Sequence, residues 1–159
     1  LVAIDPGKIQ FARRQGFQHV WNSQEGDPVQ WIQELTGGRG ADIAVEGEGV
    51  SQTLEQCLKA TRPFGKVVAM GNPMGDMKLS QHAYWELLRK QLKIMGTWNS
   101  SFTSLPKNDW ELAIRAMELG RIHVKPFITH RFSLDAGIKP FEMMRDRKEF
   151  FNKVMLVME

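Results

Sequence analysis

Hydrophobic and polar positions along the chain follow two alternating patterns. Short apolar runs predict five β-strands, at residues 1–4, about 18–21, 41–46, 65–71 and 92–98. Segments with apolar residues at helical spacing lie between these strands. The first covers residues 8–16, and the second runs from its cap, Asp27, to Gly37. The third has four residues on one face: Val50, Leu54, Cys57 and Leu58. Strands that alternate with helices predict an α/β fold with right-handed crossovers between parallel strands.

The pattern changes after residue 100. Trp110, Ala113, Ile114 and Met117 share one helical face, and Gly120 is placed to end that helix. An extended run over residues 124–132, a helix from near Ser133 and a last strand near Val154 follow. Pro140 interrupts this last helix unless it falls within the first turn. The C-terminal segment is therefore expected to form a different unit.

Composition and charge exclude several classes of protein. The chain has 159 residues, of which 42% are hydrophobic and 25% charged, and its formal net charge is +3. These values are ordinary for a globular protein with one large domain. Lys and Arg are scattered along the chain, so nucleic acid is not an expected partner. No apolar run reaches the ~18 residues of a membrane-spanning helix, and no signal sequence is recognisable, so we expect no membrane partner and a cytoplasmic location.

Few residues offer nucleophilic or metal-binding chemistry. Cys57 is the single cysteine, which excludes an internal disulfide and a zinc site built from cysteines of this chain. The 4 histidines have no two-ligand spacing such as His-x-x-x-His. No serine nucleophile elbow and no Cys–His pair is recognisable. We therefore predict no catalytic residue and no metal ligand within this chain.

Asp5 follows the first predicted strand and precedes a turn and a helix. In dinucleotide-binding folds, a carboxylate at this place accepts hydrogen bonds from the adenosine ribose, and its charge repels a 2'-phosphate. The run Asp5-Pro6-Gly7 by itself favours the simpler role, in which Asp5 caps the helix that begins near Pro6. A glycine-rich turn some 20 residues upstream would decide between these roles, but the chain begins too late to contain it.

Glycine-marked segments follow three of the predicted strands: Glu46-Gly47-Glu48-Gly49, Gly71-Asn72-Pro73 and, after Gly96, Thr97-Trp98-Asn99-Ser100. Ligands of parallel sheets bind beyond the carboxyl ends of the strands, where small residues let a planar ring approach the backbone. Any one of these glycines could simply make a tight turn. Three such ends on neighbouring strands favour a ligand site.

Several stretches resemble the medium-chain, zinc-containing alcohol and polyol dehydrogenases: Leu1 to Asp5, Lys8-Ile9 with Ala12 and Gly16, Glu34 to Asp42, and Gly65 to Val68. The run Thr36-Gly37-Gly38-Arg39-Gly40-Ala41-Asp42 is the most specific of these. Further stretches are most similar to the branch with galactitol-1-phosphate 5-dehydrogenase and sorbitol dehydrogenase: Leu88 to Leu92, Ile94 to Trp98, Trp110-Glu111 and Thr129 to Phe132.

The resemblance implies an incomplete Rossmann-like, doubly wound parallel sheet with a C-terminal segment that belongs to the catalytic domain. Residues 1–122 would be the NAD-binding domain without its first strand and glycine-rich turn, and residues 123–159 the segment that returns to the catalytic domain. The chain starts at Leu1 within an apolar run, without a Met, so we expect a fragment. The zinc ligands and most of the substrate pocket would lie outside it, and the fragment itself should be inactive.

Residue roles follow from the resemblance by position. Asp5 would bind the adenosine ribose with Lys8 beside it, and Gly47 to Gly49 would line the adenine and ribose side. Met70, Gly71 and Asn72, with Thr97 and Asn99, would flank the nicotinamide. Lys153 would lie near the pyrophosphate. The edge strand near Trp98–Phe102 would pair with a neighbour in a homodimer or homotetramer, since an unpaired apolar edge is a liability in water.

The favoured function is therefore the cofactor-binding part of an NAD-dependent zinc oxidoreductase that acts on a secondary alcohol of a polyol or polyol phosphate. A zinc-free, NADP-linked reductase of the same superfamily is an alternative, which the charge of Asp5 opposes. A nucleotide-binding module without chemistry is another. A nucleic-acid binder is more distant, and its binding would have to survive physiological salt.

Overall fold

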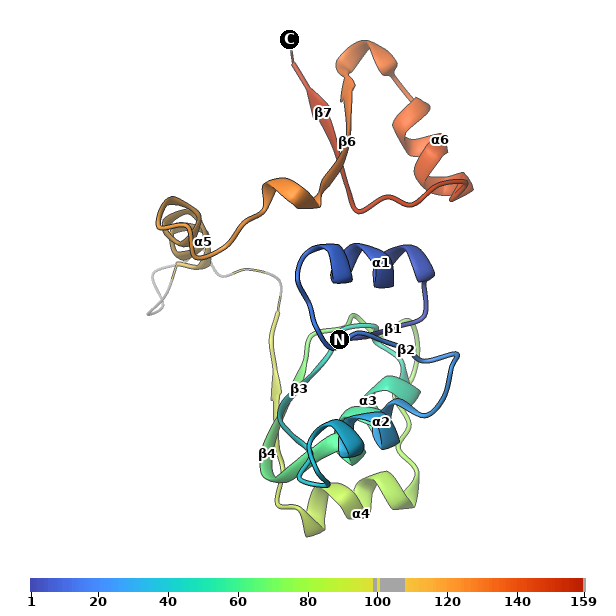
Figure 1. The fold of residues 1–159 in the computed structure, drawn as a ribbon, viewed down its shortest axis with the longest axis vertical. Coiled ribbons are helices and arrows are strands. Elements are labelled where there is room, and N and C mark those ends of the chain that lie inside the picture. The colour runs from blue at the N-terminus through green and yellow to red at the C-terminus, as the bar shows by residue number, and fades with distance from the viewer. Residues whose placement is uncertain (99, 101–107, 159) are drawn as a thin grey trace. The chain divides into compact units, whose positions relative to one another are not determined.

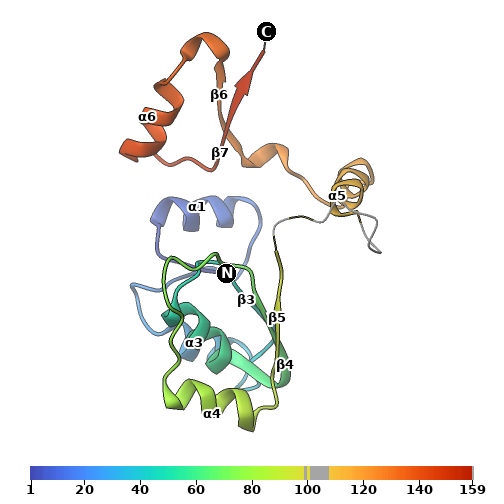
Figure 2. The ribbon, with the colours of Figure 1, turned by 180° about the vertical axis from the view of Figure 1, so that it is seen from behind.

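The computed structural model describes residues 1–98, 100 and 108–158. Figures 1 and 2 show the ribbon from opposite sides. The chain divides into two compact units. The first contains Leu1–Asp5 and His19–Asn99, and the second contains Pro6–Gln18 and Ser100–Glu159.

Strands of the first unit form two parallel sheets. Their bounds are β1 (Val2–Ala3), β2 (Trp21–Asn22), β3 (Ala41–Glu46), β4 (Thr61–Ala69) and β5 (Lys93–Gly96). β1 pairs with β2, and β4 lies between β3 and β5, with every pair parallel. The α/β class with parallel strands, predicted from the sequence, is confirmed. The predicted single sheet is divided, because among the described residues no ladder joins β1 to β3.

Three helices connect these strands: α2 (Pro28–Leu35), α3 (Ser51–Ala60) and α4 (Gln81–Arg89). α2 begins as the sequence predicts, because Asp27 Oδ1 accepts the N–H of Val29 at 2.9 Å. Ser80 caps α4 in the same way through the N–H of Ala83, at 3.2 Å. The sequence pattern does not predict α4, although parallel β4 and β5 require a crossover between them.

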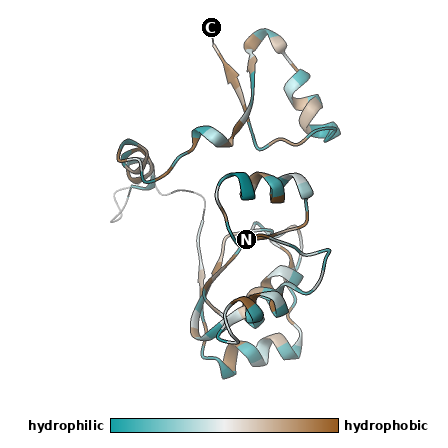
Figure 3. Ribbon diagram, viewed as in Figure 1, coloured by the Kyte–Doolittle hydropathy of each residue, from teal (hydrophilic) through white to brown (hydrophobic). Residues whose placement is uncertain are grey.

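The core of the first unit lies between the three-stranded sheet and two of these helices. Leu58 of α3, Val67 of β4 and Ala83 of α4 form it, and all three are completely buried. α3 and α4 therefore cover the same face of the sheet. In Figure 3 the helical ribbons mix hydrophilic and hydrophobic residues. This mixture is expected of helices with one side on a core and one side in water.

The opposite face of the three-stranded sheet has no helical layer within the described part of the first unit. Ala44 packs against the core, so the pleat directs its neighbours Ile43 and Val45 to the other face. There Ile43 is 57% exposed and Val45 is 56% exposed. Met95 of β5, whose strand partner Val68 is in turn the partner of Val45, is 48% exposed. This face is apolar and open.

The second unit combines α1 (Pro6–Arg14) with the C-terminal segment. That segment contains α5 (Asp109–Glu118), the 3-10 turn η1 (Lys125–Phe127), β6 (Ile128–Ser133), the turn η2 (Leu134–Ala136), α6 (Lys139–Asp146) and β7 (Lys153–Val157). β6 and β7 pair in parallel. Phe11 of α1 contacts Phe127 and Phe150, with ring centroids 5.3 and 5.5 Å apart. α1 therefore packs on aromatic residues of the C-terminal segment.

Two sequence predictions for this unit needed refinement, and the condition stated for Pro140 is met. The extended run over residues 124–132 is interrupted by η1, in which Pro126 occupies the first turn. α6 begins at Lys139 instead of near Ser133, because Gly137 has a φ of 58° and separates η2 from α6. Pro140 lies in the first turn of α6, where its missing N–H costs no helical hydrogen bond.

Over the residues that the structure describes, every helix is too short or too polar to cross a lipid bilayer.

Candidate functional site

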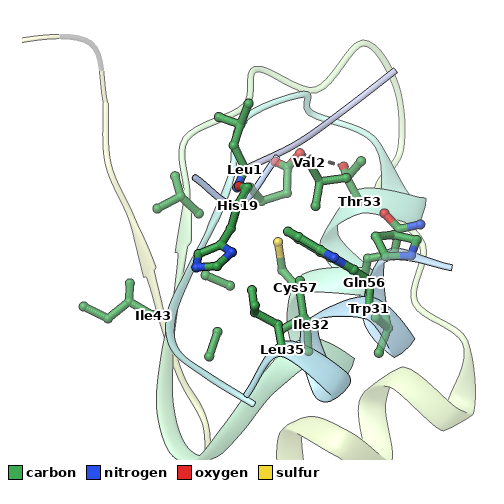
Figure 4. Close-up of a pocket in the computed structure, with 18 of the residues that line it drawn as sticks. Leu1, Val2, His19, Trp31, Ile32, Leu35, Ile43, Thr53, Gln56 and Cys57 are labelled. Carbon is green, nitrogen blue, oxygen red and sulfur yellow. Dashed lines mark hydrogen bonds between the residues drawn. The ribbon is translucent and has the colours of Figure 1, made fainter. Parts of the chain in front are cut away.

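A cavity of about 670 Å³ lies in the first unit, lined by β1, α2, β3 and α3. Figure 4 shows labelled side chains around it, among them Trp31, Ile32 and Leu35 from α2 and Cys57 from α3. Leu1 and Val2 line it from the first sheet and Ala44 and Glu46 from β3 of the second, so it occupies the space between the two sheets. Most of its lining side chains are apolar, and a few are polar.

Glu46 is the buried polar group at this cavity. It ends β3, lines the cavity and is 2% exposed. Its Oε1 accepts three hydrogen bonds: from the N–H of Glu48 at 2.8 Å, the N–H of Gly49 at 2.8 Å and the hydroxyl of Thr53 at 2.7 Å. A buried carboxylate needs such donors, because water no longer solvates it.

The backbone of Glu46 reaches a second loop. Its carbonyl oxygen accepts the N–H of Met70 at 2.9 Å and the N–H of Gly71 at 3.0 Å. We call residues 47–49 and 71–72 the glycine loops; they follow β3 and β4 respectively. Glu46 therefore holds both glycine loops, one through its side chain and the other through its main chain.

Direct contact between the glycine loops explains two of the glycines. A Cβ atom on Gly71 would collide with the backbone nitrogen of Gly49 and lie 2.7 Å from Oε2 of Glu46. A Cβ atom on Gly49, whose φ is +74°, would collide with the carbonyl oxygen of Asn72. Both positions therefore need glycine for the loops to pack. At Gly47 the nearest atom to an added Cβ is Cε of Met70, at 3.4 Å, so this position is less restricted.

The charge of Glu46 affects the titration of two groups. Burial by itself raises the pKa of the Glu46 carboxyl, but the hydrogen bonds from Thr53, Gly49 and Glu48 outweigh burial and hold the pKa below its usual value. Glu46 is thus an anion at neutral pH. Burial, and then the negative charge of Glu46, raise the pKa of the Cys57 thiol to about 11. Cys57 is therefore a neutral thiol on the cavity wall.

Residues predicted to bind the cofactor are divided between the two units. Those in the first unit are Asp5, Gly47, Gly49, Met70, Gly71, Asn72 and Thr97. The structure brings the two glycine loops together, and the N–H of Thr97 donates to Ala69 O at 3.0 Å, next to the end of β4. Asp5 lies exposed after β1.

The other three predicted residues fall elsewhere. Lys8 lies in α1 and Lys153 at the start of β7, both in the second unit. Asn99 lies outside the described residues, as does most of the predicted edge segment Trp98–Phe102. β5 ends at Gly96, before that segment.

Sequence reasoning missed Glu46 and Thr53 as parts of the site. Glu46 was noted only as the start of a glycine-marked strand end. The available signal was an acid that directly ends an apolar strand, because such an acid is buried and must find donors nearby. Thr53, in the first turn of α3, is one of those donors.

The run Thr36 to Asp42, the most specific part of the resemblance, has a structural role in the turn from α2 to β3. The hydroxyl of Thr36 donates to Ile32 O at 2.7 Å and accepts the N–H of Gly40 at 2.9 Å. Arg39 binds both carboxylate oxygens of Asp42 at 2.8 Å, and Arg62 binds one of them at 2.6 Å. These two guanidinium groups hold the pKa of Asp42 well below its usual range.

The described ranges are residues 1–98, 100 and 108–158. No group of three or more His, Cys, Asp or Glu side chains there lies together so that it could hold a metal ion. The described residues therefore offer no site for zinc built from these side chains.

Comparison with known proteins identifies the family. The family model described as zinc-binding dehydrogenase matches residues 1–118. The chain belongs to the zinc-binding dehydrogenase family. It is 27% identical over 158 residues to galactitol 1-phosphate 5-dehydrogenase of Escherichia coli (strain K12). The matched segment covers 98% of this chain and 45% of that relative. It is also 27% identical to an alcohol dehydrogenase of Cupriavidus necator, over 98% of this chain and 42% of the relative.

Solved structures give the same result for the fold. The crystal structure of galactitol-1-phosphate dehydrogenase from Escherichia coli superposes with a TM-score of 0.83 at 25% identity, over 98% of this chain and 45% of that one. The chain thus spans about half the length of the zinc-binding dehydrogenases that it matches. The fold class and the family expected from the sequence are confirmed.

Proposed function

We propose that this chain is the cofactor-holding part of an NAD-dependent zinc oxidoreductase, which transfers hydride between NAD and a secondary alcohol of a polyol or polyol phosphate. Residues 1–122 are proposed as the NAD-binding domain and residues 123–159 as the segment that returns to the catalytic domain. The zinc ligands are proposed to lie in a part of the protein outside this chain.

The observation that supports this proposal most is the pair of glycine loops beside the cavity, in a chain of the zinc-binding dehydrogenase family. The loops follow β3 and β4, which are parallel neighbours, so they lie at the carboxyl edge of the sheet. Dinucleotides bind at this edge in open parallel sheets. When bound, the nicotinamide ring supplies or accepts the hydride, and the protein positions it.

Each predicted residue receives a role in this proposal. Asp5 binds the adenosine ribose and disfavours a 2'-phosphate. Gly47 and Gly49 line the adenine and ribose side, while the remaining loop residues flank the nicotinamide: Met70, Gly71, Asn72, Thr97 and Asn99. We propose that Lys8 binds near the ribose and Lys153 near the pyrophosphate. A homodimer or homotetramer through the segment near Trp98–Phe102 completes the proposal.

The substrate class is supported by the relatives. One relative is named a galactitol 1-phosphate 5-dehydrogenase and another an erythritol/L-threitol dehydrogenase. The test uses the full-length protein, whose metal content is measured while polyols and polyol phosphates are supplied with NAD or NADP. Zinc together with NAD-linked oxidation of a polyol would support the proposal. NADP-linked reduction without zinc, or nucleotide binding without turnover, would reject it in favour of the corresponding alternative.

The role of Asp5 has a separate test, the change Asp5→Ser in the full-length protein. Removing the carboxylate should weaken the binding of NAD. It should also reduce the preference for NAD over NADP by about tenfold, because the 2'-phosphate of NADP no longer meets a negative charge. Steady-state kinetics with each cofactor measure this ratio. Asp135→Ser, which removes a carboxylate from η2 in the second unit, is the matched control. An unchanged ratio for Asp5→Ser would reject the ribose role.

A further inference from the structure

Glu46 has more hydrogen bonds than its place at the end of a strand requires. A β3 residue needs only its main-chain groups to pair with β4. Here the carboxylate also accepts Glu48 N–H, Gly49 N–H and the Thr53 hydroxyl on the single atom Oε1. The other oxygen, Oε2, lies where Gly71 approaches so closely that an added Cβ would be 2.7 Å away. Both oxygens therefore face the glycine loops.

The glycine loops are held by backbone contact with each other and by hydrogen bonds to Glu46. Gly49 has a φ of +74°, and the two loops touch backbone to backbone. Glycine lowers the cost of such conformations but adds no side chain that would fix them. The hydrogen bonds of Glu46 reach Glu48 and Gly49 through its side chain and Gly71 through its main chain, so one residue is bonded to both loops. Removing its charge would thus loosen the loop after β3, and with it the backbone contact that this loop makes with the loop after β4.

We propose that Glu46 is a positioning residue for the dinucleotide: its carboxylate and carbonyl oxygen set the relative position of the two glycine loops, and through them the two halves of the bound cofactor. This inference rests on the proposed function, since it assigns the glycine loops to the cofactor. Glu46 need not touch the cofactor itself. It fixes the loops before binding, so that less conformational freedom is lost when the cofactor binds.

Two substitutions separate this role from a general contribution to folding. Glu46→Gln keeps the shape and one acceptor oxygen, but it removes the charge and replaces the other oxygen by an N–H₂ group, which cannot accept a hydrogen bond. Thr53→Val is milder, since it replaces one hydroxyl donor by a methyl group of similar size. Thr53→Ser restores that donor and should rescue the effect.

The measurement is the dissociation constant of NADH in the full-length protein, at a temperature where circular dichroism shows each variant fully folded. We expect the constant to rise about tenfold for Glu46→Gln and about threefold for Thr53→Val, because charge-assisted hydrogen bonds are roughly twice as strong as neutral ones. Thr53→Ser should stay within about twofold of the wild type because its hydroxyl keeps the same bond. Glu34→Gln, on the surface of α2, is the matched control.

The outcomes distinguish the two proposals. If the wild-type protein binds neither NADH nor NADPH, the proposed function fails. If it binds NADH and the variants Glu46→Gln and Thr53→Val melt at lower temperatures with unchanged dissociation constants, Glu46 only stabilises the fold and the positioning role is rejected. If Glu46→Gln does not fold, Thr53→Val decides in the same way.

Discussion

At the scale of single residues, Cys57 shows how one buried charge changes the chemistry of a neighbour. It lines the cavity, so a small reagent has a path to its sulfur. Burial and then the charge of Glu46 raise its pKa to about 11, whereas an ordinary value is 9.0. Only the thiolate reacts with electrophiles, so the thiol should be unreactive at neutral pH although it lines a cavity.

We therefore predict slow alkylation of Cys57. Below both pKa values, a pKa higher by two units lowers the thiolate fraction about a hundredfold, and the rate with iodoacetamide should fall by the same order relative to a free thiol. The rate should rise about tenfold per pH unit until pH approaches the raised pKa, because the thiolate fraction rises in that proportion. Mass spectrometry of the alkylated chain over a pH series measures this. A rate that levels off near pH 9 would contradict the raised pKa.

At the scale of elements, the turn from α2 to β3 shows why a sequence run can be specific without binding anything. Gly37, Gly38 and Gly40 all have positive φ, at 60°, 81° and 82°. Only one of them is also enclosed: a Cβ on Gly40 would lie 2.8 Å from Ala60 O and 2.9 Å from Arg62 N. This turn packs on the junction between α3 and β4, which explains why its sequence is restricted.

The prediction for this turn compares the same replacement, glycine by alanine, at two positions. Gly37→Ala should cost about 1 kcal/mol of unfolding free energy, since its Cβ meets no atom within 4 Å and only the backbone conformation is strained. Gly40→Ala should cost roughly 3 kcal/mol, because backbone atoms at 2.8 Å and 2.9 Å must also move. Urea denaturation of both variants measures the difference. Equal costs would show that the turn does not pack tightly on the junction.

Local signals in the sequence were enough to predict several elements and not others. Asp27 and Pro28 mark the start of α2, and β3 has the predicted bounds Ala41–Glu46. β4 begins at Thr61, four residues before the predicted Gly65, because Thr61 pairs with Ala41 across the sheet and no local pattern reveals such a partner. The helix over residues 8–16 was predicted, but its packing on Phe127 and Phe150 depends on residues more than a hundred positions away.

The same limit applies to the candidate site. Glycines at strand ends are visible in the sequence, so the glycine loops could be located. The contact between Gly49 and Gly71, and the hydrogen bonds from Glu46 to both loops, depend on the pairing of β3 with β4. This pairing brings the two loops together at one edge of the sheet. The cavity between the sheets was not predictable, because it depends on two strand edges that no sequence pattern marks as unpaired.

At the scale of the whole molecule, the apolar face of the three-stranded sheet sets the behaviour of the chain on its own. Ile43 and Val45 are more than half exposed there, and no element in the described part of the first unit covers them. Contiguous apolar surface of this kind favours association in water. We predict that the chain of residues 1–159 binds a hydrophobic dye strongly and self-associates as its concentration rises.

A double substitution tests whether this face is responsible. Ile43→Thr with Val45→Thr keeps two β-branched residues, which suit a strand, while it makes the face polar. Dye fluorescence and the mass found by light scattering should both fall relative to the unchanged chain. Val124→Thr, which is 44% exposed in the second unit, is the matched control and should change neither measurement. If the double variant associates as strongly as the unchanged chain, the association arises from another surface, and the open face of the sheet is not what limits the chain in isolation.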